Sequence, residues 1–531
     1  MKRLRWLSLI LVLSLPFLAH CTQPVRGAFV SYDTPFDVLA RWVPAGATEA
    51  TFLDLKPAGE MGRHWAHVRQ HLEANPAGQQ VLAGLYGPYH VGEYDLSEFA
   101  RGPAVNWYCQ REMGNIFQVN DEVAVEEALR ENLGGPTWEQ TEYRGLTLHH
   151  GRLRTLRDGL AWTVRDGLLF LSYDYDGSVE DALTQLQDIV GLPESESLAA
   201  LPAWQTLRAR MPETPMSLLF NNVAGQSRGY APPSDTTSAS TALGQQIEAM
   251  SFAAVPEERG MRVEIDGLVA LQPDVPPEVR ALFDFPAVDP AAWPHLPADT
   301  AIAFVTHDAP VVWPLLSEIF GLAKSVPQLR DAVGLDLGAD LAGADGPLTG
   351  DFSVAITPPL ADQPIVQGLP AAQLLILTRD ATEAQMAGVQ AAMEARGAVF
   401  GPGEAEGVSL QVQVGTAPSG YAIAYGFDQD TLLCGSSPAV IGQGVAARHE
   451  GKGLLANPAI QELLATLPED SSFVLVLNVE PWVSLLQANM TQEQYQNRPE
   501  YVGLETFEAI GFGIRFAPHG IDGAMYFYVP E

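Results

Sequence analysis

The chain has 531 residues, of which 47% are hydrophobic and 18% charged, and its formal net charge is −34. This length and apolar content suit about two to four folded domains and exclude a disordered or low-complexity protein. A surface this acidic repels phosphate backbones, so we expect no nucleic-acid partner; cationic groups, metal ions or simple solvation are the expected uses of the charge.

The N-terminus has the pattern of a bacterial signal peptide. Basic residues at positions 2, 3 and 5 precede an apolar run over residues 6–19, which is shorter than a membrane span of about 20 residues. The run ends in Leu-Ala-His-Cys, which resembles the lipobox in which the cysteine, here Cys21, becomes the lipidated first residue. His20 departs from that pattern, and ordinary cleavage after Gly27 is the alternative.

We expect lipidation at Cys21, because the apolar run stops there. Residues 1–20 are then the signal peptide and residues 21–42 a tether. Thr22 resembles the residue type that routes lipoproteins to the outer membrane, where the organism has one. No later segment has 18 uninterrupted apolar residues, so the lipid anchor is the only membrane contact that we expect.

Residues 43–271 are predicted to form an α+β module. A first strand at residues 51–55 is followed by a helical stretch, a strand pair and a helix capped by Asp121. Antiparallel strands come next, with a hairpin turn at Asp166-Gly167. After a helical pair, three strands end the module, and apolar residues alternate with charged ones over residues 261–266. This pattern predicts a mostly antiparallel sheet with helices packed on one side.

Three histidines of the first module, His64, His67 and His71, fall within about 60° on one flank of a predicted amphipathic helix. Neutral imidazoles at this spacing can share a metal ion, although three ligands from one helix are hard to bring together. A solvated helix flank is the alternative interpretation.

A basic island stands out in this acidic chain. It consists of His149, His150, Arg152, Arg154 and Arg157. Such a cluster could hold an anion or a carboxylate. The alternative is ion pairing with the surplus of acidic groups inside the same protein.

Two loops of the first module are further candidates. The aromatic stretch Tyr86–Tyr94 could stack on a sugar or a peptide, or could cover a sheet edge instead. The stretch Asp174–Glu180 partly resembles a calcium loop but lacks its full spacing, so we interpret it as a helix cap.

The second part of the chain repeats the first. Residues 198–222 and 454–478 share eleven of 25 positions at a fixed offset of 256, and further matches keep the same order. Residues 297–531 are therefore predicted to form a second, homologous module, including a helix capped by Asp380. The Pro-rich segment 272–296 is the predicted linker. Its aromatic residues Phe283, Phe285 and Trp293 indicate that the linker packs against the modules and does not move freely between them.

Cys109 and Cys434 lie in predicted strand interiors at positions that the repeat does not equate. An exported protein could form a disulfide between them. Because they belong to different modules, two buried thiols are the favoured interpretation.

The matched motifs resemble a known family. The LPADT-type first strand, the Asp-Leu motif, the aspartate before the helix and the segment LLANPAIQELLATLPED are similar to bacterial envelope proteins grouped as a domain of unknown function. The resemblance covers nearly the whole mature chain. It implies an exported location and little more, since no activity or catalytic residue can be carried over from it.

The sequence favours a lipid-anchored envelope protein with a non-catalytic binding or structural role. A metal-dependent hydrolase that uses the first-module histidines is the alternative, and a surface receptor for a small ligand or glycan is a third hypothesis. No serine elbow, zinc-protease motif or phosphate loop occurs, so no catalytic, cofactor or metal residue is assigned. Any specific site is expected in the first module or at the module interface.

Overall fold

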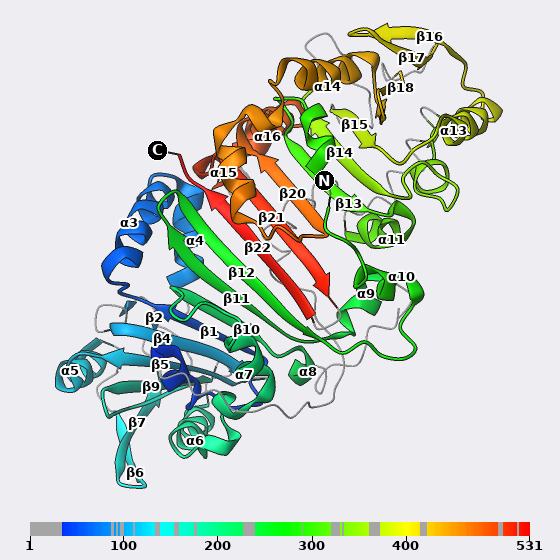
Figure 1. Ribbon diagram of the computed structural model, residues 1–531. Coiled ribbons are helices and arrows are strands. Elements are labelled where there is room, and N and C mark those ends of the chain that lie inside the picture. The colour runs from blue at the N-terminus through cyan, green and yellow to red at the C-terminus, as the bar shows by residue number, and fades with distance from the viewer. Residues whose placement is uncertain are drawn as a thin grey trace.

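The computed structural model describes residues 34–86, 90–91, 94–95, 100–109, 112–132, 138–152, 159–174, 178–226, 239–288, 290–319, 330–331, 334–359, 372–414, 422–496, 503–517 and 520–530. Within these residues, twenty strands form one continuous antiparallel sheet that runs through the whole molecule (Figure 1). We call residues 34–271 the first half and residues 272–530 the second half.

Each half contributes ten strands. From its far end to the middle of the sheet, the first half has β6 (Glu139–Tyr143), β7 (Leu146–Arg152), β8 (Gly159–Arg165), β9 (Leu168–Asp174), β5 (Glu112–Val119), β4 (Ala100–Cys109), β1 (Glu49–Asp54), β10 (Ser217–Asn221), β11 (Ile247–Glu257) and β12 (Gly260–Val269).

The second half has, again from its far end to the middle, β16 (Phe400–Ala405), β17 (Val408–Gln413), β18 (Ala424–Asp428), β19 (Thr431–Gly435), β15 (Gln373–Thr378), β14 (Asp351–Thr357), β13 (Ile302–His307), β20 (Phe473–Asn478), β21 (Ala509–Ala517) and β22 (Gly520–Tyr528). If the ten strands of each half are numbered along the chain, their order across the sheet is the same in both halves. A separate two-stranded sheet pairs β2 (His90–Val91) with β3 (Tyr94–Asp95).

The halves join where β12 pairs with β22, which we call the seam. Glu264 faces Ala524 in the antiparallel register, and these two residues are 260 positions apart, as are the turn glycines Gly260 and Gly520. A Cβ on Gly260 would lie 2.0 Å from the carbonyl oxygen of Phe527, and one on Gly520 would lie 2.2 Å from that of Gly267. Both ends of the seam therefore need glycine for the same close backbone approach.

Helices cover both faces of the sheet, so the prediction of helices on one side was wrong. On β1, Phe52 joins one apolar cluster and its neighbour Leu53 joins another on the opposite face. Neighbouring strand residues point to opposite faces, and an apolar residue on each face needs cover on each face. The alternation over residues 261–266, which contributed to the prediction of helices on one side, belongs to β12 at the seam.

The first face of the first half is covered by α2 (Pro35–Ala40), α6 (Val179–Val190) and α7 (Pro202–Arg208), and the opposite face by α3 (Gly59–Glu73), α4 (Pro76–Tyr86) and α5 (Glu122–Asn132). In the second half, η5 (Pro290–His295), α14 (Pro438–Glu450) and α15 (Pro458–Thr466) cover one face, and α10 (Pro277–Leu282), α11 (Ala309–Ile319), α13 (Glu383–Ala395) and α16 (Val479–Asn489) cover the other.

Short helices also pack across the seam. In the first half, α9 (Ala239–Gly244) contacts α11 of the second half, and η9 (Gly503–Thr506) of the second half contacts α4 of the first. Leu243 accordingly belongs to the same apolar cluster as Leu315, and Phe507 packs against the cluster around Trp65. The two halves therefore share apolar contacts as well as a strand pair.

The linker, residues 272–296, packs against elements that follow it in the second half. Phe283 is 3% exposed and meets Phe516 edge to face, with ring centroids 5.6 Å apart, and Trp293 is 2% exposed in another cluster. Burial of these rings, which the sequence suggested, holds most of the linker against the folded protein.

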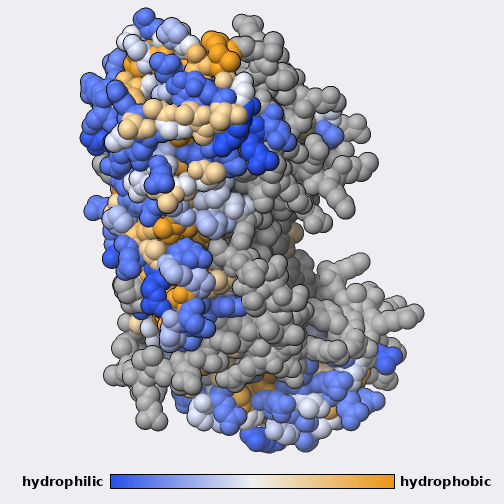
Figure 2. All heavy atoms as spheres, turned by 90° about the vertical axis from the view of Figure 1, so that its right-hand side faces the viewer, coloured by the Kyte–Doolittle hydropathy of each residue, from blue (hydrophilic) through white to orange (hydrophobic). Residues whose placement is uncertain are grey.

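The outer surface is mostly polar, as expected for a chain with a net charge of −34. On the face seen in Figure 2, the described residues are mostly hydrophilic, with apolar patches scattered among them. No helix within the described ranges is both long and apolar enough to cross a membrane.

Candidate functional site

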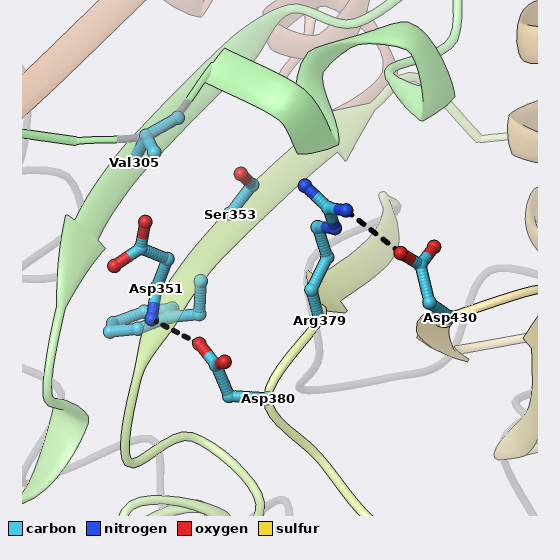
Figure 3. Close-up of a pocket in the computed structure, with 7 residues that line it drawn as sticks. Val305, Asp351, Ser353, Arg379, Asp380 and Asp430 are labelled. Carbon is cyan, nitrogen blue, oxygen red and sulfur yellow. Dashed lines mark hydrogen bonds and ion pairs between the residues drawn. The ribbon is translucent and has the colours of Figure 1, made fainter.

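The second half contains a polar hollow of about 410 Å³ at one end of β13, β14 and β15, beside the β18–β19 hairpin (Figure 3). It is lined by Val305, Asp351, Phe352, Ser353, Arg379, Asp380 and Asp430. Its volume is in the usual range for small-ligand sites. We call it the aspartate hollow.

Strand pairing builds one wall of the aspartate hollow. The register of β13 and β14 sets His307 opposite Asp351 and Val305 opposite Ser353. Asp351 and Ser353 are two residues apart on β14, so they project from the same face of the sheet. His307 is buried and its Nδ1 contacts Asp351 Oδ1, while its Nε2 has no partner among the described residues.

Asp380 brings a second carboxylate next to Asp351. Its Oδ2 accepts a hydrogen bond from the backbone N–H of Asp351 at 3.1 Å. Gly350 makes room for it, because a Cβ at that position would lie 2.0 Å from Asp380 Oδ2. The absence of a side chain at Gly350 therefore lets Asp380 reach the start of β14.

The prediction that Asp380 caps the following helix was wrong. Helix α13 begins at Glu383, and its N-cap is Thr382, which forms a reciprocal capping box with Gln385. The spacing Thr-x-x-Gln was the local signal for the cap. Asp380 is thereby left available to the aspartate hollow.

The far wall is an ion pair. Arg379 Nη2 donates to Asp430 Oδ2 at 2.8 Å, and the two side chains are 43% and 57% exposed. The hydrogen bond from Arg379 holds the pKa of Asp430 below its ordinary value. Arg379 thus neutralises one of the three carboxylates in the lining.

Ser353 is the unusual residue of the aspartate hollow. It is 0% exposed, and its Oγ has no hydrogen-bond partner among the described residues. Figure 3 shows the side chain between Asp351 and Arg379. A buried hydroxyl without a partner loses its hydration without compensation, so its place on the floor of a hollow is a specific reason to look for a ligand.

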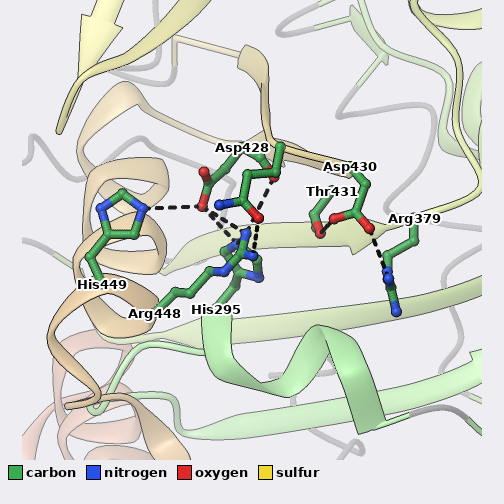
Figure 4. A network of polar contacts seen from close by, with 8 residues as sticks. His295, Arg379, Asp428, Asp430, Thr431, Arg448 and His449 are labelled. Atoms are coloured by element: carbon green, nitrogen blue, oxygen red, sulfur yellow. Dashed lines mark hydrogen bonds and ion pairs between the residues drawn. The ribbon is translucent and has the colours of Figure 1, made fainter.

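A polar network centred on the buried side chains of His295 and Asp428 adjoins the aspartate hollow at the β18–β19 turn (Figure 4). His295 Nε2 donates to Asp428 Oδ2 at 3.0 Å, Arg448 Nη1 donates to the same oxygen at 3.1 Å, and His449 lies 3.6 Å from it. Arg448 also donates to Gln429 Oε1 at 2.6 Å. These contacts anchor the hairpin that carries Asp430.

The network also shifts pKa values. Burial by itself would raise the pKa of Asp428, but the hydrogen bond from His295 and the charge of Arg448 outweigh it, so this pKa lies below its ordinary value. Burial lowers the pKa of His295, and its hydrogen bond with Asp428 opposes that effect only in part. At neutral pH the network therefore pairs a neutral imidazole with a carboxylate and a guanidinium.

The lining has an excess of negative charge, with three carboxylates against one guanidinium. Carboxylates accept hydrogen bonds and do not donate them, so the lining suits a ligand that is cationic or rich in donors. The described ranges contain no group of three or more His, Cys, Asp or Glu residues placed to hold a metal ion.

The three histidines on α3 do not converge on one point. The rings of His67 and His71 meet edge to face at 4.8 Å, and burial followed by the charge of His67 lowers the pKa of His71. His64 instead has its Nδ1 3.4 Å from the carbonyl oxygen of Pro256 and its Nε2 4.0 Å from Glu60.

The basic island is divided by the sheet. His149 is 2% exposed and stacks on Trp162, with ring centroids 4.1 Å apart, whereas His150 points to the opposite face and shares a 3.0 Å hydrogen bond with Thr141. Arg152 lies at the end of β7. The predicted residues Arg154 and Arg157 lie outside the described ranges.

The two candidate loops have structural roles where they are described. Tyr86 Oη accepts from Trp65 Nε1 at 3.1 Å, which ties the end of α4 to α3. In the second loop, Ser178 caps α6 by accepting from Asp181 N at 3.0 Å, and Asp174 accepts from Ser178 N at 2.7 Å. The interpretation of that loop as a cap is confirmed.

The favoured interpretation of two buried thiols is confirmed for Cys434 only, because Cys109 is partly exposed. Cys109 and Cys434 are both thiols, in different halves. Burial raises the pKa of Cys434 to about 12, so it is an inert core residue. Cys21, the predicted lipidation site, lies outside the described ranges.

Sequence reasoning expected any specific site in the first half or at the interface, but the aspartate hollow lies within the second half. Three of its residues follow strand ends, and no sequence motif links Asp351 to Asp430. The one usable signal was the serine at position 353, because it interrupts the otherwise apolar stretch of β14.

The chain was compared with curated proteins and with solved structures. No curated protein matches the chain. Two solved structures, titled "Structure of crystal form IV of TP0453" and "Structure of crystal form III of TP0453", are 10% and 9% identical; they cover 42% and 47% of this chain and 80% and 88% of their own, each at a TM-score of 0.24. That score is too low to support an argument about fold or function.

A protein family is matched over most of the length. The family described as "Protein of unknown function (DUF3352)" matches residues 110–521. This range includes most of the first half and the whole aspartate hollow. The resemblance stated from the sequence motifs is confirmed, and the chain belongs to the DUF3352 family.

Proposed function

We propose that this protein is an exported, lipid-anchored bacterial envelope protein that binds a ligand without catalysing a reaction, and that the aspartate hollow is its binding site. Export and anchoring rest on the signal-type N-terminus that ends at Cys21. An acylated N-terminal cysteine would hold the folded part at a membrane surface.

The binding role rests on one observation. Ser353 is fully buried at the floor of the aspartate hollow, and its hydroxyl has no partner among the described residues. An unpaired buried hydroxyl costs stability. A polar ligand that enters with a local shift of the side chains over Ser353 would supply the missing hydrogen bond. Charged residues on both walls would then orient the ligand.

We also infer that the two halves are homologous modules that arose by duplication. Support comes from the common strand order and from the seam, whose register is centred on the equivalent residues Glu264 and Ala524. A pairing that is symmetric about equivalent positions is the arrangement of a twofold dimer. The chain would thus be a tethered form of such a dimer.

Binding is tested by a screen of small polar compounds, read out as the thermal shift of the wild-type protein and of Ser353→Ala. A compound that raises the melting temperature of the wild type and leaves Ser353→Ala unchanged supports the proposal. Hits that stabilise both proteins equally would place binding elsewhere and overturn the assignment of the aspartate hollow.

Anchoring is tested by fractionating cells that express the full-length chain or Cys21→Ala. We expect the wild type in the membrane fraction after a high-salt wash and the variant in the soluble extracytoplasmic fraction. Identical behaviour of both proteins would rule out a lipid anchor at Cys21, and retention in the cytosol would rule out export.

The alternative of a metal-dependent hydrolase gains no supporting observation. Within α3, His67 and His71 are adjacent, but no further ligand among the described residues completes a group of three. We therefore do not develop the hydrolase hypothesis.

A further inference from the structure

We propose that His67 and His71 of helix α3 form a two-histidine chelate for a divalent transition-metal ion such as zinc or nickel. The site lies in the first half and is separate from the aspartate hollow. It goes beyond the proposed binding function, because it adds a second site for a ligand of a different chemical class.

Helix α3 presents the two imidazoles to solvent on one flank. The buried residues of α3 are Trp65, Val68 and Leu72, which belong to the apolar cluster on that face of the sheet. His67 and His71 are both partly exposed. Residues at positions i and i+4 share a face of a helix. An ion from solvent can therefore reach both rings without a rearrangement of the core.

The two imidazoles have no competing polar partner. Among the described residues, neither ring forms a hydrogen bond or an ion pair, and the rings contact each other. An imidazole nitrogen whose lone pair accepts no hydrogen bond is available to a metal ion. His64 differs, because its Nδ1 lies 3.4 Å from the carbonyl oxygen of Pro256 and its Nε2 lies 4.0 Å from Glu60.

The separation of the rings fits a shared ion. An imidazole that binds zinc at about 2.0–2.1 Å places its ring centroid about 3.2 Å from the ion. Two such rings, at the angles of about 90–110° found in square-planar and tetrahedral sites, have centroids about 4.5–5.2 Å apart. The centroids of His67 and His71 are 4.8 Å apart. The χ2 torsion of histidine is broad, so each ring can turn a nitrogen toward the ion.

The ligand type selects the ion. Imidazole suits zinc, copper and nickel, whereas magnesium and calcium prefer oxygen ligands. Arg63, one turn before His67, opposes a cation locally, and the net charge of −34 favours one. No third His, Cys, Asp or Glu among the described residues completes the site. Water or a group from another molecule would fill the remaining positions, so we expect weaker binding than at a structural zinc site with four protein ligands.

The proposal is tested by calorimetric titration of the full-length protein, without a histidine tag and freed of metal by a chelator, with zinc chloride or nickel chloride. Excess magnesium chloride in the buffer occupies the acidic surface, so that binding through nitrogen ligands stands out. We expect saturable zinc binding by the wild type. His67→Gln and His71→Gln should each weaken it at least about tenfold, because each removes one of two ligands.

His64→Gln is the matched control on the same helix. Glutamine is a good helix former at an exposed position, so all three variants should keep the melting temperature of the metal-free wild type. The control should bind zinc as the wild type does. In a second readout, diethyl pyrocarbonate modifies unliganded histidines and mass spectrometry locates the modified positions. Zinc should protect His67 and His71 and leave His64 reactive.

The results that would overturn the proposal are specific. Zinc affinity that is unchanged in His67→Gln or in His71→Gln would mean that the two imidazoles do not act as a pair. An equal loss of affinity in His64→Gln, or no saturable binding of either ion above the magnesium background, would also refute the site. None of these results bears on the aspartate hollow, because His67 and His71 lie on α3 of the first half.

Discussion

At the residue scale, Ser353 and Ser172 form a natural comparison. Both are 0% exposed strand serines, but Ser172 Oγ donates to Gln185 Oε1 at 2.6 Å, whereas Ser353 Oγ has no partner among the described residues. The free-energy cost of a buried hydroxyl depends on whether its hydrogen bond is made. The two serines should therefore respond in opposite ways to the same substitution.

We predict that Ser353→Ala raises the free energy of unfolding by about 1 kcal/mol, because it removes an unpaired buried hydroxyl. Ser172→Ala should lower it by about 1 kcal/mol, because it breaks a hydrogen bond and leaves Gln185 without a donor. Urea denaturation of both variants measures these changes. A loss of stability in Ser353→Ala would mean that its hydroxyl is already satisfied.

His149 should make stability depend on pH. Burial, followed by the charges of Arg130 and His150, lowers its pKa from about 6.5 to about 4. The unfolded chain therefore takes up the proton first as the pH falls. The stability contributed by this group is complete above about pH 6.5 and is lost progressively down to about pH 4, by roughly 2–3 kcal/mol in total.

The test is His149→Phe, which preserves an aromatic ring against Trp162 and cannot be protonated. Its free energy of unfolding should fall less than that of the wild type between pH 7 and pH 4, by roughly 2 kcal/mol. Denaturant melts at several pH values supply the comparison. Parallel pH profiles for the two proteins would contradict the assignment of this titration to His149.

At the element scale, the ends of the seam depend on glycine. A Cβ on Gly520 would meet the carbonyl oxygen of Gly267 at 2.2 Å, and backbone atoms of a paired strand cannot move aside without disturbing the pairing. At the other end of the seam, the equivalent contact of Gly260 with the carbonyl oxygen of Phe527 likewise leaves no room for a Cβ. Both positions limit how closely β12 and β22 can approach.

We predict that Gly520→Ala lowers the free energy of unfolding by about 2–4 kcal/mol, and that Gly260→Ala has a similar effect. Gly388→Ala is the control, because Gly388 is exposed in α13 with no atom within 4 Å of the new Cβ. That change should stabilise the helix by up to about 1 kcal/mol. Equal effects at Gly520 and Gly388 would contradict the close approach at the seam.

The helix that follows β15 shows what local sequence can and cannot predict at this scale. Asp121 does cap α5, since it accepts from the N–H groups of Val123 and Ala124. The matching Asp380 does not cap α13, because Thr382 and Gln385 form a capping box two residues later. One aspartate is thus structural in the first half, while its counterpart contacts β14 in the second.

At the scale of the whole molecule, the two halves form one sheet and should stay together without the covalent link. Eight residue pairs join β12 to β22, and apolar side chains such as Leu243 and Leu315 pack in one cluster from opposite halves. Burial of such shared apolar surface drives stable association in dimers.

We predict that cutting the linker leaves the molecule intact. A protease site inserted between Pro286 and Ala287, which are both exposed, allows the full-length folded protein to be cleaved. After cleavage, size-exclusion chromatography should show one species of unchanged hydrodynamic size that contains both fragments. Separation into two smaller species would contradict a stable seam.

The sequence by itself determined the local elements and their order in each half. The turn at Asp166 and Gly167, where both residues have positive φ, and the cap at Ser178 depend on contacts within a few residues, so composition and spacing suffice to predict them. The internal match at an offset of 256 likewise needs only a comparison of the chain with itself.

Only the tertiary structure decided where the halves meet, which faces the helices cover and where the aspartate hollow forms. Asp351, Arg379 and Asp430 are brought together by the pairing of β13, β14 and β15 and by the hairpin beside them. Non-local strand pairing is set by the burial of apolar faces over the whole sheet. No short stretch of sequence carries that information, which is why the site could not be found until the strands were placed side by side.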